Sequence, residues 1–452
     1  MPPRPESGTL RAALAGSSAT LLGRHATVSL SDMDRVIADD LTGAHVLLRT
    51  RDQLHAALAL IELDGVAARI VIAPPDVKPE HLPAVIERAS IDVVVGDDPA
   101  LAVEKTGFAL ATLPKPGAVP PAPCHTPTCY TEWVLFTSGT TGIPKMVVHS
   151  LQGLTGAIAP RAASGITWGT FYDIRRYGGL QILLRALLGH ANLVLSDAEE
   201  ELADFLGRLG RHGVTHLTGT PSHWRRVLMS PANALIAPGY IRLSGEIADQ
   251  AVLDSLKVRF PDAAIGHAYA STEAGVGFEV NDGREGFPAA LIGAPGPVEI
   301  KVMDGALHLR SSRTATQYVG GGDLMQDGWV DTGDMVEQRG ERFYFAGRKG
   351  GIINVGGLKI HPEEIEAVIN RHPGVRMSRV FGRKNPITGA IVVAEVVLAA
   401  NDNAQDDIRK EILETCRQML PAFKVPAMLR FVPCLELTAG GKLSRFQEGR
   451  HA

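Results

Sequence analysis

The regular alternation of short apolar runs with helix-type stretches constrains the fold of this chain more than any other feature. His45–Leu48 and Ala68–Ala73 are short apolar runs, and between them Arg51–Leu63 has apolar residues at three- and four-residue spacing. The same order, a helix-type stretch followed by an apolar run, continues as far as Val95. Strands that alternate with helices of this length are typical of right-handed βαβ units. The N-terminal region is therefore predicted to contain a parallel sheet.

This alternation returns near residue 180 and then gives way to another pattern. Helix-type and strand-type stretches follow one another from Leu180 to Phe260, whereas Val298–Phe345 consists of short alternating strands with glycine turns. The second pattern is typical of antiparallel or barrel-like structure. The composition changes again after Gly347, and the roughly 100 residues that remain are enough for a small α+β domain. We expect two domains, residues 1–348 and residues 349–452.

Composition and charge narrow the possible partners. The chain has 45 Lys and Arg against 49 Asp and Glu, a net charge of −4, which argues against a polybasic nucleic-acid arm. The apolar runs stay well below the roughly 18 residues of a membrane span, so we expect neither a nucleic-acid partner nor a transmembrane helix. Four cysteines in 452 residues are too few for a disulfide framework and indicate a reducing compartment, so a cytoplasmic location is predicted.

The most specific local feature is a loop rich in small polar residues that follows the apolar run ending at Phe136. Six of the nine residues after Phe136 are Gly, Ser or Thr, and the ninth is Lys145. Backbone N–H groups, hydroxyls and one ammonium in such a loop can hold a phosphate group. The loop is not a Walker A motif, which needs Gly-x4-Gly-Lys followed by Ser or Thr. Its polar members are Thr137, Ser138, Gly139, Thr140, Thr141 and Gly142.

Five segments in a fixed order resemble the adenylate-forming superfamily, which contains acyl- and aryl-CoA synthetases, peptide-synthetase adenylation domains and luciferases. The chain is most similar to the AMP-forming acyl-CoA synthetases. One matching motif would be moderate evidence, but five in the correct order are strong evidence. The segments are the phosphate loop, Ala268-Tyr269-Ala270-Ser271-Thr272-Glu273, residues 327–334 ending in Thr-Gly-Asp, residues 347–366 beginning with Gly347-Arg348, and residues 438–445 around Lys442.

The resemblance implies a fold and a reaction. The fold is α/β: a large N-terminal domain of layered parallel-sheet α/β subdomains plus a distorted β-barrel, with a small mobile C-terminal α+β domain. The reaction joins a small-molecule carboxylic acid to ATP, which gives acyl-AMP and pyrophosphate, and then transfers the acyl group to a thiol. ATP, Mg²⁺ and coenzyme A are the implied cofactors and co-substrates.

The resemblance also assigns roles to single residues. Thr140, Thr141 and Lys145 would hold the β- and γ-phosphates, Thr272 would contact the α-phosphate, and Glu273 would bind Mg²⁺ through oxygen. Lys442 would bridge the substrate carboxylate and the α-phosphate. The remaining expected nucleotide contacts are Tyr269 on adenine, Asp334 on the ribose hydroxyls, Arg348 on ribose or phosphate, and Gly245, Glu246, Ala270 and Ser271 around the base.

Three further groups of residues are implied by position alone. A hinge is expected at Lys349 and Gly350, and the thiol tunnel at Gly356, Gly357 and Lys359. The acyl pocket is expected at Tyr172, Arg175, Tyr177 and Gly178.

Arg175 has two competing interpretations. It can pair with Asp173 as a structural ion pair, or it can bind a second polar or anionic group of the substrate. In an extended segment, consecutive side chains point to opposite faces, so only one of Arg175 and Arg176 can face the pocket.

At a few positions this sequence differs from the family motifs, and we expect these differences to affect the range of substrates and the reaction rate more than the class of reaction. Met146 and Ala270 each stand where a glycine is usual, and Glu436 stands where a proline is usual. The reacting groups Lys145, Thr272, Glu273, Asp334, Arg348 and Lys442 are all present, which argues against a non-catalytic nucleotide-binding homologue.

The sequence leaves the acceptor and the acid open. A stand-alone adenylation enzyme that loads a carrier-protein phosphopantetheine uses the same thiol arm as coenzyme A. Oxygen or an amine could also serve in the second step. The sequence does not name the carboxylic acid.

Overall fold

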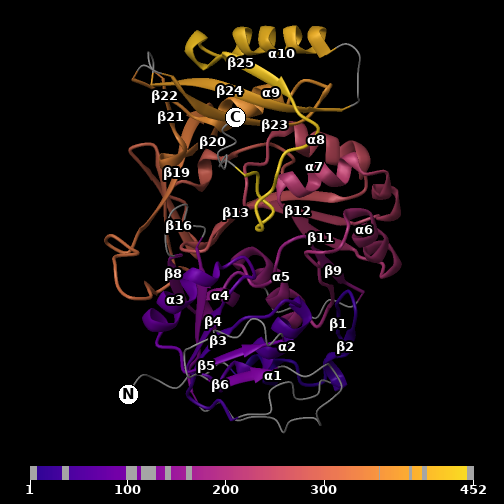
Figure 1. The fold of residues 1–452 in the computed structure, drawn as a ribbon, viewed down its shortest axis with the longest axis vertical. Helices are drawn as coiled ribbons and strands as arrows, with labels where there is room; N and C mark the ends of the chain where they lie inside the picture. The colour runs from indigo at the N-terminus through magenta and orange to yellow at the C-terminus, as the bar shows by residue number, and fades with distance from the viewer. Residues whose placement is uncertain are drawn as a thin grey trace.

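The protein is described here by a computed structural model. In Figure 1 the chain runs from the N-terminal region at the bottom of the view to the C-terminal region at the top. The described residues are 8–32, 40–97, 109–112, 129–137, 144–158, 165–355, 357–385, 389–399 and 405–444.

A mostly parallel sheet of eight strands forms one layer of the described N-terminal region. Its neighbours pair in parallel except at the two ends, where β1 pairs antiparallel with β2 and β13 with β14. In spatial order its strands are β14 (Gly275–Val280), β13 (Ala264–Ser271), β12 (Tyr240–Ser244), β11 (His216–Gly219), β9 (Thr167–Thr170), β10 (Asn192–Val194), β1 (Thr20–Leu22) and β2 (Thr27–Ser29).

A second sheet of seven described strands lies beside it. Its central strands are parallel, whereas β7, β8 and β18 are joined by antiparallel pairing. In spatial order its strands are β18 (Gln317–Tyr318), β8 (Met146–Ser150), β7 (Glu132–Phe136), β4 (Arg69–Ile72), β3 (His45–Leu48), β5 (Val93–Gly96) and β6 (Ala109–Thr112).

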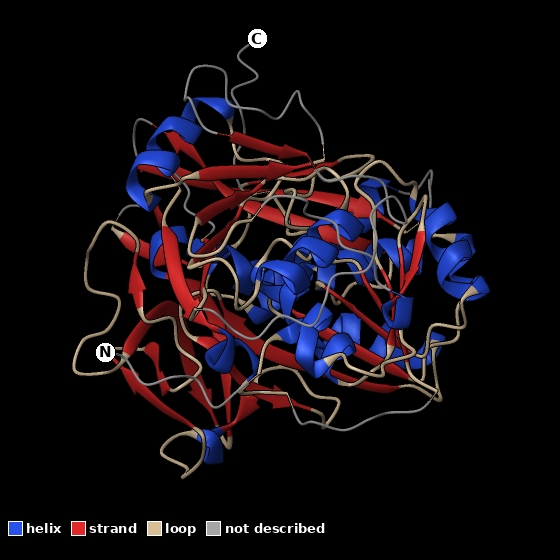
Figure 2. Cartoon of the chain, turned by 90° about the horizontal axis from the view of Figure 1, so that it is seen from below, coloured by secondary structure: helices blue, strands red, loops and turns tan. Residues whose placement is uncertain are grey.

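Helices fill the space between these two sheets and cover their outer faces. Helix α2 is buried almost all round, and it packs with α5 in one apolar cluster that also contains residues of both sheets. A helix that is apolar on every side belongs in such an interior position. Figure 2 shows helices in the centre of the molecule with strands around them. The helices of this region are α1 (Leu10–Ala13), α2 (Gln53–Leu63), α3 (Leu82–Ala89), α4 (Leu151–Thr155), α5 (Tyr177–Leu188), α6 (Leu202–Arg211), α7 (Pro221–Met229) and α8 (Gln250–Arg259).

An antiparallel sheet of five described strands connects this region to the C-terminal part. Its core contains buried Phe287, Leu307 and Leu309. It corresponds to the antiparallel, barrel-like piece predicted for residues 298–345. In spatial order its strands are β15 (Phe287–Pro288), β20 (Arg342–Arg348), β19 (Val330–Arg339), β17 (Ala306–Ser311) and β16 (Val298–Met303).

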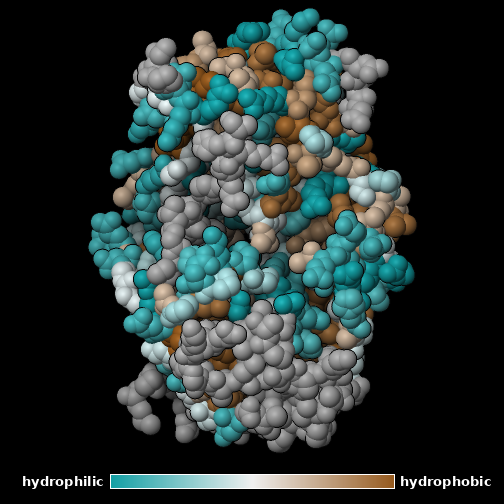
Figure 3. Space-filling model, in the orientation of Figure 1, coloured by the Kyte–Doolittle hydropathy of each residue, from teal (hydrophilic) through white to brown (hydrophobic). Residues whose placement is uncertain are grey.

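The C-terminal part has an apolar cluster of its own, made of residues between Ile353 and Leu429. On the face drawn in Figure 3, hydrophilic and hydrophobic residues are interspersed over this part, at the top of the view. The predicted boundary between residues 348 and 349 stays a prediction. The elements of this part are β21 (Ile353–Val355), β22 (Leu358–Ile360), α9 (Pro362–Ile369), β23 (Val375–Asn385), β24 (Gly389–Leu398), α10 (Gln405–Met419) and β25 (Met428–Phe431).

The predicted alternation is confirmed, with small shifts that have local causes. Helix α2 begins at Gln53 rather than Arg51, because the Asp52 side chain accepts a hydrogen bond from Leu54 N at 2.7 Å and caps the helix there. Strands β1 and β2 were not predicted, since three-residue strands are too short to show a period.

One strand of the predicted antiparallel piece lies in a different sheet. β18 pairs with β8 instead of with its sequence neighbours, through Gln317↔Val148 and Tyr318↔Val147. This pairing brings Tyr318 next to the strand that begins just after Lys145, and so into the candidate site.

Within the described ranges, no helix is both long and apolar enough to span a membrane.

Candidate active site

The β7–β8 hairpin holds both ends of the predicted phosphate loop. Thr137 N donates to Lys145 O at 2.9 Å, which closes the hairpin at the base of the loop. Thr137 is buried and Lys145 is exposed. Ser138, Gly139, Thr140, Thr141 and Gly142 lie outside the described residues, so their role in phosphate binding stays a prediction.

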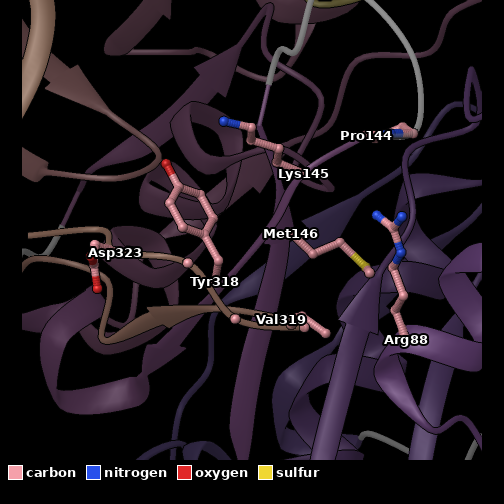
Figure 4. A pocket seen from close by; sticks show the side chains of 10 residues that line it. Arg88, Pro144, Lys145, Met146, Tyr318, Val319 and Asp323 are labelled. Carbon is pink, nitrogen blue, oxygen red and sulfur yellow. The ribbon is translucent and has the colours of Figure 1, made fainter.

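A recess of about 480 Å³ lies beside Lys145. Figure 4 shows Lys145 and Tyr318 on one side of it, and Arg88 on the other. Lys145 Nζ lies 5.4 Å from the centroid of the Tyr318 ring, which is a cation–π distance. Two cationic side chains at one recess favour an anionic ligand. The Tyr318 ring holds the ammonium by cation–π attraction.

The Thr272-Glu273 turn between β13 and β14 rests on a buried histidine. His149 Nε2 donates to Thr272 O at 2.8 Å, and its ring packs against Tyr177 with centroids 5.7 Å apart. Burial lowers the pKa of His149 to about 4, so the ring is neutral at physiological pH. A neutral ring that donates from Nε2 has one fixed tautomer, and this fixes the position of the turn.

Glu273 presents a partly exposed carboxylate at this turn. Its backbone is held by Ala315 N, which donates to Glu273 O at 3.0 Å. Burial raises the pKa of Tyr318, and the negative charge of Glu273 raises it further, so the two side chains lie close together. The predicted metal ligand and the Lys145–Tyr318 pair therefore lie at one site. A carboxylate in this position has the oxygen donors that Mg²⁺ prefers.

Asp334, Tyr269 and Arg348 form a second group, in which the carboxylate joins two partners. Tyr269 Oη donates to Asp334 Oδ2 at 2.5 Å, and Arg348 Nε donates to Asp334 Oδ1 at 2.8 Å. The Tyr269 ring also stacks with Phe278 and Phe345, at centroid distances of 5.4 and 5.3 Å. Burial and the charge of Asp334 keep the pKa of Tyr269 well above its ordinary value, so its hydroxyl remains a donor.

The structure thus brings together Asp334 and Arg348, which lie opposite each other on β19 and β20. Contact of Asp334 with ribose and stacking of Tyr269 on adenine stay predictions.

The Lys442 hairpin of the C-terminal part docks onto the N-terminal region. Leu443 N donates to Glu246 Oε1 at 2.6 Å, and the other oxygen of Glu246 accepts from Ser222 N at 2.9 Å. Thr220 Oγ1 donates to Gly441 O at 2.6 Å. These contacts join the hairpin to the loop after β12 and to the first turn of α7.

Ala270 and Ser271 lie near the end of β13, which pairs with β12 up to Ser244↔Ala268.

Gly441 allows a very close approach in this dock. Its φ is +70°, and a Cβ atom built on it would lie 1.8 Å from Cε1 of His223. Only glycine fits both the left-handed backbone and the contact with the histidine ring. His223 itself closes a capping box on α7 with Thr220.

Lys442 lies among charged groups from both parts of the chain. Burial lowers its pKa, Glu246 and Asp334 act in the opposite direction, and Arg348 and Arg176 lower it further. The residue nevertheless keeps an exposed surface. Lys442 has many protein atoms around it and still has surface that solvent can reach, so it lines a recess and does not stand on a convex surface. Its Cε lies 3.4 Å from a Cβ atom built on Gly245.

The residues predicted for the acyl pocket fall into two groups. Tyr172 Oη donates to Ser244 O at 2.9 Å, and its ring lies against Gly178. Tyr177 is buried in the core, and its hydroxyl bonds to the backbone of Val276. The assignment of Tyr172, Tyr177 and Gly178 to an acyl pocket stays a prediction.

Arg175 adopts the structural alternative, and its predicted role as a substrate contact is wrong. The side chain is 2 % exposed. Its Nε and Nη2 donate to the two oxygens of Asp173 at 2.8 and 2.7 Å, and Nη1 donates to the carbonyls of Thr50 and Arg51. The guanidinium has its donors engaged within the protein, because burial of a charge requires such pairing.

The predicted hinge and thiol residues lie on exposed backbone. Gly350 has no positive φ, and a Cβ atom built on it would meet nothing within 4 Å, so the conformation described here does not itself require glycine. Lys349 Nζ donates to Asp331 Oδ2 at 2.6 Å. Gly357 and Lys359 are exposed on the β21–β22 hairpin, and Gly356 lies outside the described residues. Both assignments stay predictions.

Sequence reasoning missed the residues that hold the site together. For His149 and Tyr318 the contacts join positions more than 100 residues apart, and no local pattern signals them. Thr220 and His223 are spaced as a capping box at the start of α7, so the cap, though not the contact with Gly441, could have been found from sequence.

Comparison with known families identifies the family of this chain. A family model described as "AMP-binding enzyme" matches residues 2–315, and one described as "AMP-binding enzyme C-terminal domain" matches residues 364–442. The first match alone covers more than half of the chain. The protein therefore belongs to the AMP-binding enzyme family, and the predicted membership of the adenylate-forming superfamily is confirmed.

Relatives and solved structures agree with this membership. A 2-succinylbenzoate–CoA ligase of Listeria monocytogenes is 27% identical over 379 residues, which cover 80% of this chain and 79% of the relative. The o-succinylbenzoate coenzyme A synthetase of Bacillus subtilis, solved with ATP and magnesium, matches with a TM-score of 0.74 at 18% identity and covers 97% of this chain and 98% of the other. An amide bond synthetase of Marinactinospora thermotolerans matches with a TM-score of 0.78 at 20% identity, covering 96% and 97%. The structural matches confirm the predicted fold.

Replacement of Arg175 by methionine should destabilise the protein without changing its preference among acids. The change leaves Asp173 without its bidentate partner in a largely buried place, and breaking such a pair costs about 3–5 kcal/mol. We expect a lower Tm and an equal loss of kcat/KM for every acid tested. Arg24→Met removes an exposed pair with Asp197 and is the control. An unchanged Tm with a loss confined to acids that carry a second polar group would contradict the structural role.

Acid should destabilise the fold through His223. Burial, followed by the charge of Arg226, lowers the pKa of His223 from 6.5 to about 3. Below pH 6.5 the unfolded chain binds a proton at His223, whereas the folded protein leaves this histidine neutral down to about pH 3. The free energy of unfolding is therefore undiminished above pH 6.5 and falls as the pH is lowered toward 3. The loss at pH 5 is about 2 kcal/mol.

Urea unfolding at pH 7.5 and pH 5 measures this effect. His223→Asn keeps an acceptor near the position of Nδ1 but does not titrate, and should show a smaller difference between the two pH values. Equal differences in both proteins would contradict the assignment.

Proposed function

We propose that this protein is an AMP-forming carboxylate–CoA ligase. The observation that carries the proposal is the docked Lys442 hairpin. It places an ammonium from the C-terminal part beside Asp334, Arg348 and Glu246 of the N-terminal region. Membership of the AMP-binding enzyme family and the CoA ligases among the relatives support it. The division into domains at residues 348 and 349 is part of the proposal.

In the first step a carboxylate oxygen attacks the α-phosphorus of ATP, and pyrophosphate leaves with the electron pair of the broken bond. Two anions must approach each other, so the site has to supply positive charge that is already in place. Lys442 would lie between the carboxylate and the α-phosphate, and Thr272 would donate to the α-phosphate. Lys145 would hold the outer phosphates, with its ammonium oriented by Tyr318.

Glu273 is the residue of this chain that would hold Mg²⁺. When bound, the ion neutralises charge on the phosphates. His149 contributes by fixing the backbone of Thr272, which keeps the adjacent Glu273 in place.

In the second step the thiol gives up its proton to water, its sulfur attacks the acyl carbon, and AMP leaves with the electron pair of the broken bond to the acyl carbon. Coenzyme A is our proposed acceptor, because curated relatives in two bacterial genera are CoA ligases. A carrier-protein phosphopantetheine is the alternative thiol. The amide bond synthetase among the structural matches gives a reason to include an amine as a third acceptor.

A pyrophosphate-release screen over a panel of carboxylic acids tests the proposal. Release that depends on the acid and on ATP, with thioester formed only when coenzyme A is added, is the expected result. Thioester formed only with a carrier protein, or amide formed with an amine, would replace coenzyme A as the acceptor. An absence of acid-dependent pyrophosphate release with every acid would refute the proposal.

Lys442→Ala should separate the two steps. Loss of one charge-assisted contact in the adenylation transition state costs about 3–4 kcal/mol, roughly 10²–10³ in rate. The family resemblance implies that the C-terminal domain rotates and carries Lys442 away before thioester formation. We therefore expect thioester formation from pre-made acyl-AMP to persist in the variant. An equal loss in both steps would show that Lys442 does not act in adenylation alone.

A further inference from the structure

We propose that Arg176 is a further catalytic residue, which donates hydrogen bonds to phosphoryl oxygens of ATP and to the departing pyrophosphate. The inference rests on the proposed function. It starts from the contrast between two consecutive arginines. Arg175 is engaged in the interior, whereas Arg176 is the N-cap of α5 and pairs with Asp76 instead.

Arg176 lies against the Lys442 hairpin. A Cβ atom built on Gly440 would lie 3.8 Å from Arg176 Cδ and 3.9 Å from its Nε. The charge of Arg176 is also among the groups that lower the pKa of Lys442, after burial and Arg348.

Protein carboxylates also lie beside both cations, Glu246 and Asp334 beside Lys442 and Asp76 beside Arg176. An anion bound between Lys442 and Arg176 would be attracted by both of them. This arrangement favours a shared anionic ligand between Lys442 and Arg176.

The guanidinium of Arg176 retains donors for such a ligand. Its Nη2 is paired with Asp76. Its Nε is buried and has no hydrogen-bond partner among the described residues. A buried donor without a partner is costly, and an arginine can bind an anion through two parallel N–H groups. The ion pair with Asp76 engages Nη2 and holds the planar group, and Nε remains as the buried donor for the ligand.

The position of Asp76 in the fold indicates which anionic ligand Arg176 would bind. Asp76 follows β4, and β4 pairs in parallel with β7 up to Ile72↔Leu135. The carboxyl ends of both strands therefore lie at the same edge of the sheet, where Thr137 begins the phosphate loop. Arg176 lies between that edge and the Lys442 hairpin. In the proposed reaction, the group that has to extend from the phosphate loop at this edge to the Lys442 hairpin is the triphosphate of ATP.

The role fits the chemistry of the first step. As the carboxylate oxygen bonds to the α-phosphorus, the bond from that phosphorus to the bridging oxygen breaks, and negative charge accumulates on pyrophosphate. Arg176 would stabilise this charge by hydrogen bonds, and no proton is transferred.

The experiment compares Arg176→Gln, Arg176→Lys and the control Arg24→Gln. Arg24 is also paired with an aspartate, Asp197, at a comparable exposure. Two reactions are measured: conversion of pre-made acyl-AMP and inorganic pyrophosphate to ATP, and conversion of pre-made acyl-AMP and coenzyme A to thioester.

For Arg176→Gln we expect the conversion of acyl-AMP and pyrophosphate to ATP to slow roughly 10²–10³-fold with every accepted acid, as for loss of one preorganised donor. The KM for pyrophosphate should rise about 10-fold. Thioester formation and Tm should stay close to wild type. Arg176→Lys should recover part of the loss, and Arg24→Gln should behave like wild type.

Three outcomes would overturn the inference. A loss confined to acids with a second anionic group would mean that Arg176 binds the substrate tail. An equal loss in both reactions with a lower Tm would mean a structural role, and an unchanged KM for pyrophosphate would exclude contact with that group. In each case acid-dependent pyrophosphate release by the wild type would leave the proposed function standing. Its absence would instead refute the proposed function itself.

Discussion

The arrangement of the site depends on one carboxylate, that of Glu246. Its two oxygens accept hydrogen bonds from Ser222 N, in the first turn of α7, and from Leu443 N, directly after Lys442. The first backbone N–H groups of a helix have no partner within the helix, so an acidic side chain there is stabilised twice, by the hydrogen bond and by the helix dipole. Glu246 uses its second oxygen to hold the Lys442 hairpin at the same place. The position of the ammonium follows from this shared acceptor.

The neighbours of Glu246 make the dock possible. Gly441 is close enough to His223 that no side chain fits between them, and the low pKa of His223 keeps a second positive charge away from Lys442. Charges of both signs surround Lys442: the carboxylates of Asp334 and Glu246 raise its pKa, and the guanidinium groups of Arg348 and Arg176 lower it. An anion bound at this site would be held by those cations whose donors are not already engaged within the protein.

The sequence predicted the elements and the motif residues, because both depend on local patterns. Strand β3 was predicted to the residue, and Asp334 and Arg348 were expected in one site and lie in direct contact. The sequence could not decide between Arg175 and Arg176, since which of two consecutive side chains faces inward depends on the register of the whole segment. It also could not show the partner of Glu246, which lies 197 residues further along the chain.

The most direct test of this account is the comparison of Glu246→Ala with Glu246→Gln in acid-dependent ATP–pyrophosphate exchange and in thioester formation from pre-made acyl-AMP. A hydrogen bond to a charged group contributes about 1.5–3 kcal/mol, so loss of the carboxylate should slow the exchange roughly 10- to 100-fold. Glutamine keeps one acceptor oxygen and should fall between alanine and wild type. Thioester formation should stay within about twofold, since the proposed rotation of the C-terminal domain would undock the Lys442 hairpin in that step. Exchange at the wild-type rate in Glu246→Ala would contradict the claim that this carboxylate positions Lys442.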